Sequence, residues 1–260
     1  MAVPGRIVGP PADIAETDLF AVDAYRTTFD ARVEEVEREA GRVALSRTAF
    51  YPGGGGQPND LGVFDLPNGT ARVAKVKRDG ARIWHWLDTP ELPDIGDEVC
   101  GHVDWDRRYL LMRTHTALHI LCGVVWSEFR VPVTGGNMDP GSGRLDFPLE
   151  SMSGDLGRRL EQRMNEEIAA AREILIEFVG RSDADHDDAL IRTSANLIPA
   201  EIDPLRVITI VGLDKQADGG THVFNTARVG SVRVTRTESK GRVNKRVRLE
   251  VGPAASGADA

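Results

Sequence analysis

The sequence predicts an α+β fold in two parts, a small N-terminal β-barrel domain followed by an α+β domain. Short apolar runs separated by glycine and proline fill the first part, whereas apolar residues at helical spacing begin abruptly near Asp104. Histidines whose spacing could hold a metal occur in the second part. We therefore expect a barrel over residues 1–103, a metal-binding domain over 104–251 and a disordered tail over 252–260.

The first part is expected to consist of strands between Thr28 and Val103. Runs of strand length with alternating or clustered apolar residues occur at 42–45, 71–76 and 81–86. Turn-forming glycine and proline separate these runs, and no helical period of useful length appears among them. Closure into a small barrel is the economical arrangement, because it removes exposed strand edges.

The second part mixes helices with strands. Apolar residues recur at helical spacing over 106–129 and again over 155–174, and a shorter helix is expected over 183–191. A buried strand is expected at 207–211, and one or two more over 231–251. This mixture is typical of an α+β domain.

The amino-acid composition indicates which broad class of protein this chain belongs to. The 260 residues are 41% hydrophobic and 28% charged, as in an ordinary globular protein. No apolar run approaches the ~20 residues of a membrane-spanning helix, and the N-terminus lacks the apolar core of a secretory signal. Because Cys100 and Cys122 are the only cysteines, no disulfide framework is expected. We expect a cytoplasmic protein without a membrane partner, whose oligomeric state the sequence does not determine.

The distribution of charge is uneven. A net charge of −8 argues against a protein that coats nucleic acid. Between residues 233 and 248, however, the sequence contains seven Lys or Arg residues and a single acidic residue, Glu238. Two interpretations remain open: the solvated face of a terminal strand, or a small patch that contacts phosphate.

Two histidine-containing segments predict a metal site. His115 and His119 are four residues apart on an expected helix, which places both imidazoles on one face, about 6 Å apart at Cβ. Thr116 follows His115, so the zinc-protease motif with its general-base glutamate is absent. In the second segment, Asp218-Gly-Gly-Thr-His222, the glycines let the chain turn so that both ends converge.

The fourth ligand is open between two residues. Asp218 offers a carboxylate, which zinc accepts at about 2.0–2.2 Å. Cys122 follows His119 by three residues, on nearly the same helix face, and would be a softer ligand. We favour Asp218, because a small buried cysteine is ordinarily part of a core.

Six segments of the sequence carry recognisable motifs. They are Phe50 to Pro58 (FYPGGGGQP), Arg113 to Leu121 (RTHTALHIL), Arg144 to Phe147, Arg206 to Ile208, Asp218 to Val223 (DGGTHV) and Glu238 to Arg246. Together they resemble motifs of the editing domain of alanyl-tRNA synthetase and of its free-standing relatives of medium length, the AlaX trans-editing proteins. The matches keep the family's order and cover about residues 25 to 251.

The resemblance implies a metal-dependent deacylase that hydrolyses mischarged tRNA(Ala) at its 3′ end, with one Zn²⁺ per chain. Ser-tRNA(Ala) is the expected first substrate and Gly-tRNA(Ala) the second, because an alanine pocket cannot exclude glycine and rejects serine only about 10²-fold if it is mainly apolar. The metal would either lower the pKa of a water molecule or position the ester. Because the 260 residues leave no room for an aminoacylation domain, we expect no activation with ATP.

Site residues follow from the matched motifs. The expected metal ligands are His115, His119, Asp218 and His222, and the expected catalytic residues are Gln57 and Thr116. Gln57 could alternatively brace the glycine turn. Residues expected to contact the substrate are Gly54, Gly55, Gly56, Gln57, Thr221, Lys240, Arg242 and Lys245.

One departure from the family pattern affects the metal. The family usually has cysteine where this chain has Asp218. The change could weaken zinc binding, admit another divalent ion or leave three histidines as the ligands. Two alternative functions follow: a non-catalytic tRNA- or protein-binding module that keeps the fold, and a zinc hydrolase of other amino-acid esters.

Overall fold

The computed structural model describes residues 7–149, 155–184, 186, 190, 202–239, 241 and 244–253. They form two compact units. One unit is Pro10–Tyr109, and the described residues on both sides of it in the sequence form the other. Among the described residues, none of the helices is both long and apolar enough to cross a membrane.

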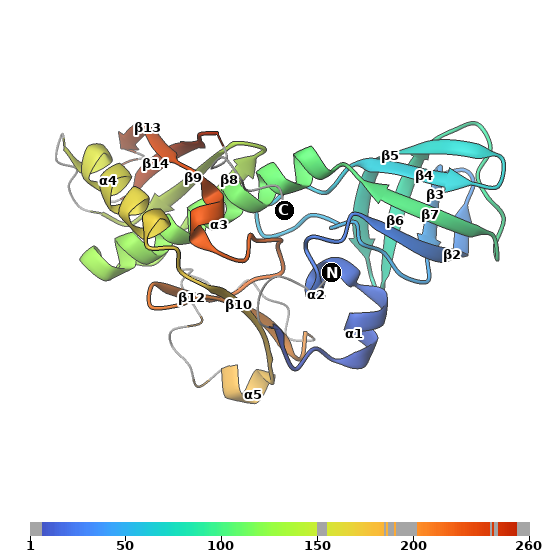
Figure 1. The fold of residues 1–260 in the computed structure, drawn as a ribbon, viewed down its shortest axis with the longest axis horizontal. Coiled ribbons are helices and arrows are strands. Elements are labelled where there is room, and N and C mark those ends of the chain that lie inside the picture. The colour runs from blue at the N-terminus through green and yellow to red at the C-terminus, as the bar shows by residue number, and fades with distance from the viewer. Residues whose placement is uncertain are drawn as a thin grey trace. The chain divides into compact units, whose positions relative to one another are not determined.

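The first unit is built around a closed six-stranded barrel, as the sequence predicts. Neighbouring strands pair in the order β2-β3-β6-β5-β4-β7, and all the pairs are antiparallel. Two short helices, α1 (Ala12–Thr17) and α2 (Leu19–Val22), precede it in the chain (Figure 1). The strands are β2 (Thr28–Glu37), β3 (Arg42–Leu45), β4 (Gly62–Leu66), β5 (Gly69–Asp79), β6 (Arg82–Asp88) and β7 (Glu98–Val103).

Aromatic rings fill the barrel. Phe29, Phe50 and Phe64 meet edge to face, with ring centroids 5.5–6.5 Å apart. His85 is also fully buried, and its Nε2 lies 2.9 Å from Oγ1 of Thr48. The alternation of buried and exposed residues along β2 and β5 follows from this packing, because successive side chains point to opposite faces of a strand.

The second unit contains two four-stranded sheets. One has the order β1-β10-β11-β12 and the other β13-β14-β9-β8. The first sheet consists of β1 (Ile7–Val8), β10 (Ile174–Val179), β11 (Leu205–Ile210) and β12 (Asp214–Ala217). The second consists of β8 (Gly135–Asp139), β9 (Ser142–Phe147), β13 (Val232–Ser239) and β14 (Lys245–Val251).

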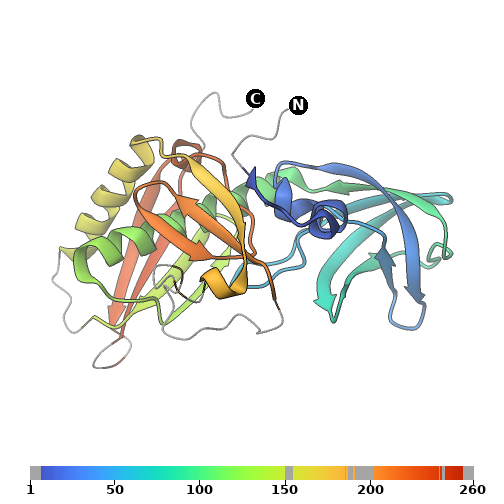
Figure 2. The same cartoon turned by 90° about the horizontal axis from the view of Figure 1, so that it is seen from below.

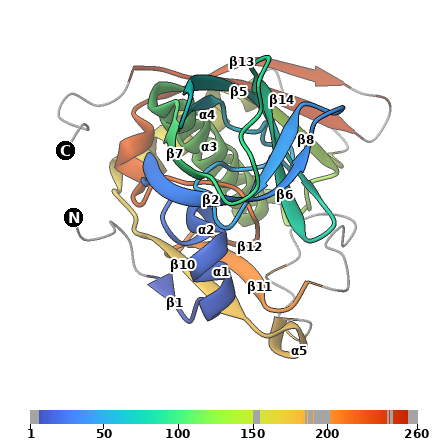
Figure 3. The same ribbon diagram turned by 90° about the vertical axis from the view of Figure 1, so that its right-hand side faces the viewer.

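Helix α3 (Trp105–Phe129) runs between these two sheets. Its Leu118 packs against Gly143 of β9, and its Gly123 packs against Leu213, next to β12. In Figures 1 and 3 the β13–β14 sheet lies above α3, and Figure 2 shows the hairpin of β11 and β12 in front of it when seen from below. Residues 111–125 are therefore all buried, although the sequence predicts only an apolar stripe.

The other helices differ from the sequence prediction at their ends. Helix α4 (Leu156–Ala169) buries Leu156, Leu160, Met164 and Ile168, and packs against β13. It ends five residues before the expected Ile174, because Ala171 adopts a left-handed φ of 50° and Ile174 begins β10. Helix α5 (Arg181–Ala184) overlaps the short helix expected over 183–191 only at residues 183–184, and 185, 187–189 and 191 lie outside the described residues. Of the expected tail, 254–260 also lie outside them.

Candidate metal centre

Helix α3 places two imidazoles side by side. His115 and His119 are one helical turn apart, and their ring centroids are 5.0 Å apart. Each residue is only 5–6% exposed, because the sheets on both sides of α3 cover it. Burial of two imidazoles on one turn costs free energy unless their ring nitrogens find partners.

The second segment is the loop after β12. The Asp218 carboxylate accepts a hydrogen bond from the Gly220 amide at 2.7 Å, and the Arg206 guanidinium donates to the carbonyls of Asp218 and Gly220 at 2.9 and 2.8 Å. Neither Gly219 nor Gly220 has a positive φ, so the turn does not need the left-handed backbone that only glycine adopts readily. Side-chain hydrogen bonds, rather than glycine flexibility, hold this loop in shape.

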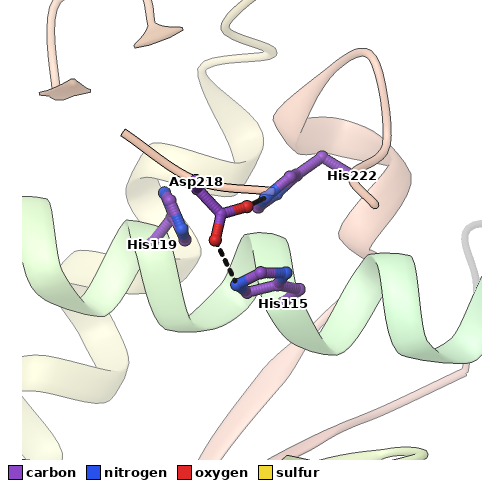
Figure 4. Close-up of side chains that lie close together, drawn as sticks. All are labelled: His115, His119, Asp218 and His222. Carbon is purple, nitrogen blue, oxygen red and sulfur yellow. Dashed lines mark hydrogen bonds and ion pairs between the residues drawn. The ribbon is translucent and has the colours of Figure 1, made fainter. Parts of the chain in front are cut away.

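The two segments converge on one point (Figure 4). His222 lies with its ring centroid 4.3 Å from that of His115 and 4.6 Å from that of His119. Asp218 contacts two of the rings: its Oδ2 is 3.0 Å from Nε2 of His222, and its Oδ1 is 3.6 Å from Nε2 of His115. One potential ligand atom from each of the four residues lies within 4.8 Å of all the others. The loop and the helix thus form a single cluster.

The charge states of His115, His222 and Asp218 suit metal ligation. Burial lowers the pKa of His115 to about 4, against the opposing effect of Asp218. Burial and the neighbouring His115 lower the pKa of His222 well below its usual value. Burial raises the pKa of the Asp218 carboxyl, but the surrounding imidazoles and the hydrogen bond with His222 outweigh it, so the net pKa lies well below the usual range. Two neutral imidazoles and an ionised carboxylate are forms in which these residues bind metals.

The donor set fits a divalent cation. Three imidazole nitrogens and one carboxylate oxygen are ligands that zinc accepts, and their acceptor atoms face one another inside the unit. Cys122 is buried and not disulfide-bonded, and it lies outside this cluster. The cluster could therefore hold one metal ion.

Another group with metal-binding residue types lies on the barrel. Asp65, Cys100 and His102 come from the paired strands β4 and β7. Their side chains are more open to solvent, with His102 39% and Asp65 54% exposed, and the two are joined by a 2.9 Å hydrogen bond. Exposed clusters of this kind are common without a metal, so the buried cluster is the stronger candidate.

Thr116 and Thr221 are fully buried. Thr116 Oγ1 lies 3.2 Å from Nδ1 of His222 and accepts a hydrogen bond from the Val223 amide at 3.3 Å. Its hydroxyl therefore links α3 to the loop through the ring nitrogen that faces away from Asp218. This contact places Thr116 beside His222, one of the four clustered residues.

The glycine-rich loop belongs to the barrel unit. Gly53, Gly54, Gly55 and Gly56 all have positive φ, between 56° and 138°, which L side chains rarely adopt. The backbones of Gly54 and Gln57 exchange two hydrogen bonds at 2.9 and 3.0 Å, and the Gln57 residue is 3% exposed. The loop is thus a hydrogen-bonded turn with a buried glutamine.

A buried ion pair anchors this loop. The Arg108 guanidinium donates to the Asp60 carboxylate and to the carbonyls of Ala24 and Ala49, and neither charged side chain is more than 1% exposed. Asp60 also accepts from the amide of Tyr51 at 2.6 Å. The sequence patterns did not reveal this pair.

The basic segment is largely paired within the protein. Lys245 is 5% exposed, and its Nζ donates to Ser239 Oγ and to the Gly241 carbonyl. Lys240 and Arg242 lie outside the described residues. The four arginines of this segment that are described each form an ion pair: Arg233 with Glu250, Arg236 and Arg248 with Glu238, and Arg246 with Asp146.

Comparisons with known proteins agree with this architecture. The model of class II (A) tRNA synthetases matches residues 16–107, and that of the threonyl and alanyl tRNA synthetase second additional domain matches 205–248. The chain is 37% identical to the alanyl-tRNA editing protein AlaX-M of Saccharolobus solfataricus over 238 residues, which are 91% of this chain and 99% of the relative. The chain belongs to the AlaX-M family of alanyl-tRNA editing proteins. The AlaX-M protein of Methanosarcina barkeri is 34% identical over 234 residues, 88% of this chain and 96% of that protein.

The AlaX-M family also shares sequence with a synthetase. This chain is 34% identical over 230 residues to the alanine–tRNA ligase of Thermococcus kodakarensis, covering 87% of this chain but 25% of the ligase. Most of this chain thus corresponds to about a quarter of the ligase.

Proposed function

We propose that this protein hydrolyses mischarged tRNA(Ala), Ser-tRNA(Ala) first and Gly-tRNA(Ala) second, at a metal held by His115, His119, His222 and Asp218. The observation that carries the proposal is the buried His/His/His/Asp cluster, in a chain that spans 99% of a relative named as an alanyl-tRNA editing protein. Three imidazoles alone would leave zinc an open fourth position for water or substrate, whereas Asp218 as a fourth ligand would fill a tetrahedral site unless the metal accepts a fifth ligand.

The chain's own residues have distinct proposed roles. A divalent metal in the cluster would supply Lewis acidity toward an ester carbonyl or a water molecule. Thr116 holds the His222 ring through Nδ1, so its role in this proposal is to position a ligand. The hydrogen-bonded turn of Gly54, Gly55, Gly56 and Gln57 is one proposed contact for the aminoacylated end of the tRNA. Thr221 is proposed separately as a substrate contact.

The basic segment contributes less to this proposal than its composition suggests. Lys245 is buried and bonded to its own hairpin, and this supports a structural role for its ammonium group. Lys240 and Arg242 remain the proposed phosphate contacts. Charge-reversal variants K240E and R242E should weaken tRNA binding and make it less sensitive to salt, because phosphate contacts release counterions.

A deacylation panel tests the proposal. Zinc-loaded protein is incubated with Ser-, Gly- and Ala-tRNA(Ala) and with free serine esters. We expect fast release of serine, slower release of glycine, little release of alanine and little cleavage of the free ester. Equal rates on Ser- and Ala-tRNA(Ala) would contradict editing. Binding without cleavage would indicate a non-catalytic module, and preferential cleavage of free esters would indicate a hydrolase of small substrates.

A further inference from the structure

A second aspartate lies behind the metal cluster. Asp214, the first residue of β12, has a side chain that is 0% exposed, and its Oδ2 is 3.2 Å from Nδ1 of His119. The Gln216 amide donates to the same Oδ2 at 2.6 Å. Asp214 is not one of the four clustered residues, and no motif in the sequence singles it out.

The position of Asp214 follows from strand geometry. Side chains two residues apart in a strand point to the same face, so Asp214, Gln216 and the following Asp218 share one side of the chain. That side faces α3, because Asp218 reaches His115 and Asp214 reaches His119. One segment therefore presents two carboxylates to the two histidines of the helix.

The two carboxylates meet different nitrogens. Asp218 approaches Nε2 of His115 and Nε2 of His222, whereas Asp214 approaches Nδ1 of His119. An imidazole has two ring nitrogens, and a partner at Nδ1 leaves Nε2 for the cluster. We propose that Asp214 is a positioning residue that accepts a hydrogen bond from Nδ1–H of His119 and thereby holds Nε2 toward the metal. This inference rests on the metal centre of the proposed function.

The ring of His222 also has a partner at its Nδ1 atom, and this partner comes from α3. Thr116 of α3 lies 3.2 Å from Nδ1 of His222, so a helix residue holds the ring of the loop histidine. Asp214 of β12 lies 3.2 Å from Nδ1 of a helix histidine, His119. The two contacts join α3 and the β12 loop. Both involve Nδ1, so the Nε2 atoms of His119 and His222 remain for the metal. Carboxylate partners of this kind fix the tautomer of a ligand and make it more basic.

The first test uses the unaltered protein. Protein labelled with ¹⁵N at histidine is loaded with zinc, and two-bond nitrogen–proton spectra assign the metal-bound nitrogen of each ring. We expect His119 to bind zinc through Nε2, with a protonated Nδ1 whose proton resonance lies far downfield because it bonds to a carboxylate. Coordination of His119 through Nδ1 would overturn the proposal without the need for any variant.

The second test replaces the carboxylate. Zinc affinity, measured by competition with a chromophoric chelator, should fall about 10–100-fold in Asp214→Asn, as for other outer partners of zinc-bound histidines. Only the Nδ1–H resonance of His119 should shift substantially. The matched control is Glu167→Gln, which removes another buried carboxylate of the same unit, one paired with Arg163 and Arg172, and should leave zinc affinity unchanged.

The outcomes separate this inference from the proposed function. Unchanged zinc affinity in Asp214→Asn, or an equal loss in Glu167→Gln, would overturn the role of Asp214 and leave the metal centre intact. A wild-type protein that binds no zinc would overturn both. Neither measurement uses tRNA, so failure of the deacylation assay alone would contradict the proposed substrate and leave the role of Asp214 standing.

Discussion

The two units each bury a cluster of charged or polar side chains, and the clusters are built differently. In the barrel unit, the Arg108 guanidinium is surrounded by acceptors: the Asp60 carboxylate and two carbonyls. In the other unit, three imidazoles and the Asp218 carboxylate point their acceptor atoms at one another. The first cluster contains its own cation, whereas the second has the arrangement of a cation-binding site. The difference distinguishes a structural ion pair from a candidate metal site.

The largest expected effect tests the structural pair. Arg108→Met leaves the Asp60 carboxylate buried without its partner and should lower the free energy of unfolding by about 3–5 kcal/mol. Urea unfolding measures the change. The matched control is Arg32→Met, which breaks an exposed pair with Glu98 in the same barrel and should cost less than about 1 kcal/mol. Equal effects of the two substitutions would contradict the structural role.

The next effect concerns pH and the barrel core. Burial lowers the pKa of His85 to about 4 in the folded barrel, from the usual value of 6.5. Between pH 4 and 6.5 the ring is therefore neutral in the folded protein and protonated in the unfolded chain. The contribution of the neutral His85 ring to the free energy of unfolding is therefore fully present above pH 6.5 and is lost as the pH falls toward 4. The loss should reach about 3 kcal/mol.

A variant isolates this contribution of His85. His85→Gln should be less stable than the wild type at pH 7, since it loses the ring packed between Phe50 and Phe64. Its free energy of unfolding should fall by less than that of the wild type between pH 7 and pH 4. Parallel pH profiles for the two proteins would show that His85 is not the group responsible.

A smaller effect tests the fourth ligand. Asp218→Cys replaces the carboxylate with a thiolate and should tighten zinc binding about tenfold, or about 1.4 kcal/mol, if residue 218 binds the metal. Chelator competition measures the affinity. Asp139→Cys adds a thiol at an exposed position of β8 and should change nothing. An unaltered zinc affinity in Asp218→Cys would indicate that Asp218 only shapes the turn.

Local patterns in the sequence predict the parts of the site that depend on local geometry. The four-residue spacing of His115 and His119 determines a shared helix face, and the structure places both in one cluster with His222. The strand-length runs before Val103 likewise predict the closed barrel. The histidine pair lies within one helix, and the strands themselves form from local alternation, although closure of the barrel joins the distant strands β2 and β7.

Contacts between distant residues were not predictable in this way. Asp214 meets His119 and Arg108 meets Asp60 only after the fold brings α3 together with β12 or with the barrel loop. The parallel pairing of β1 with β10 joins Ile7 to Ile176, which no local pattern encodes. The glycines of the β12 loop were interpreted as the cause of its turn, but hydrogen bonds of Asp218 and Arg206 hold it.

The metal content of the purified protein tests the central claim most directly. Elemental analysis after incubation with zinc and desalting should give about one zinc per chain for the wild type. His119→Ala should lose that zinc, while His102→Ala, in the exposed group on the barrel, should keep it. Circular dichroism establishes that both variants are folded. Zinc retained by folded His119→Ala, or lost from His102→Ala, would contradict the assignment of the metal centre to the buried cluster.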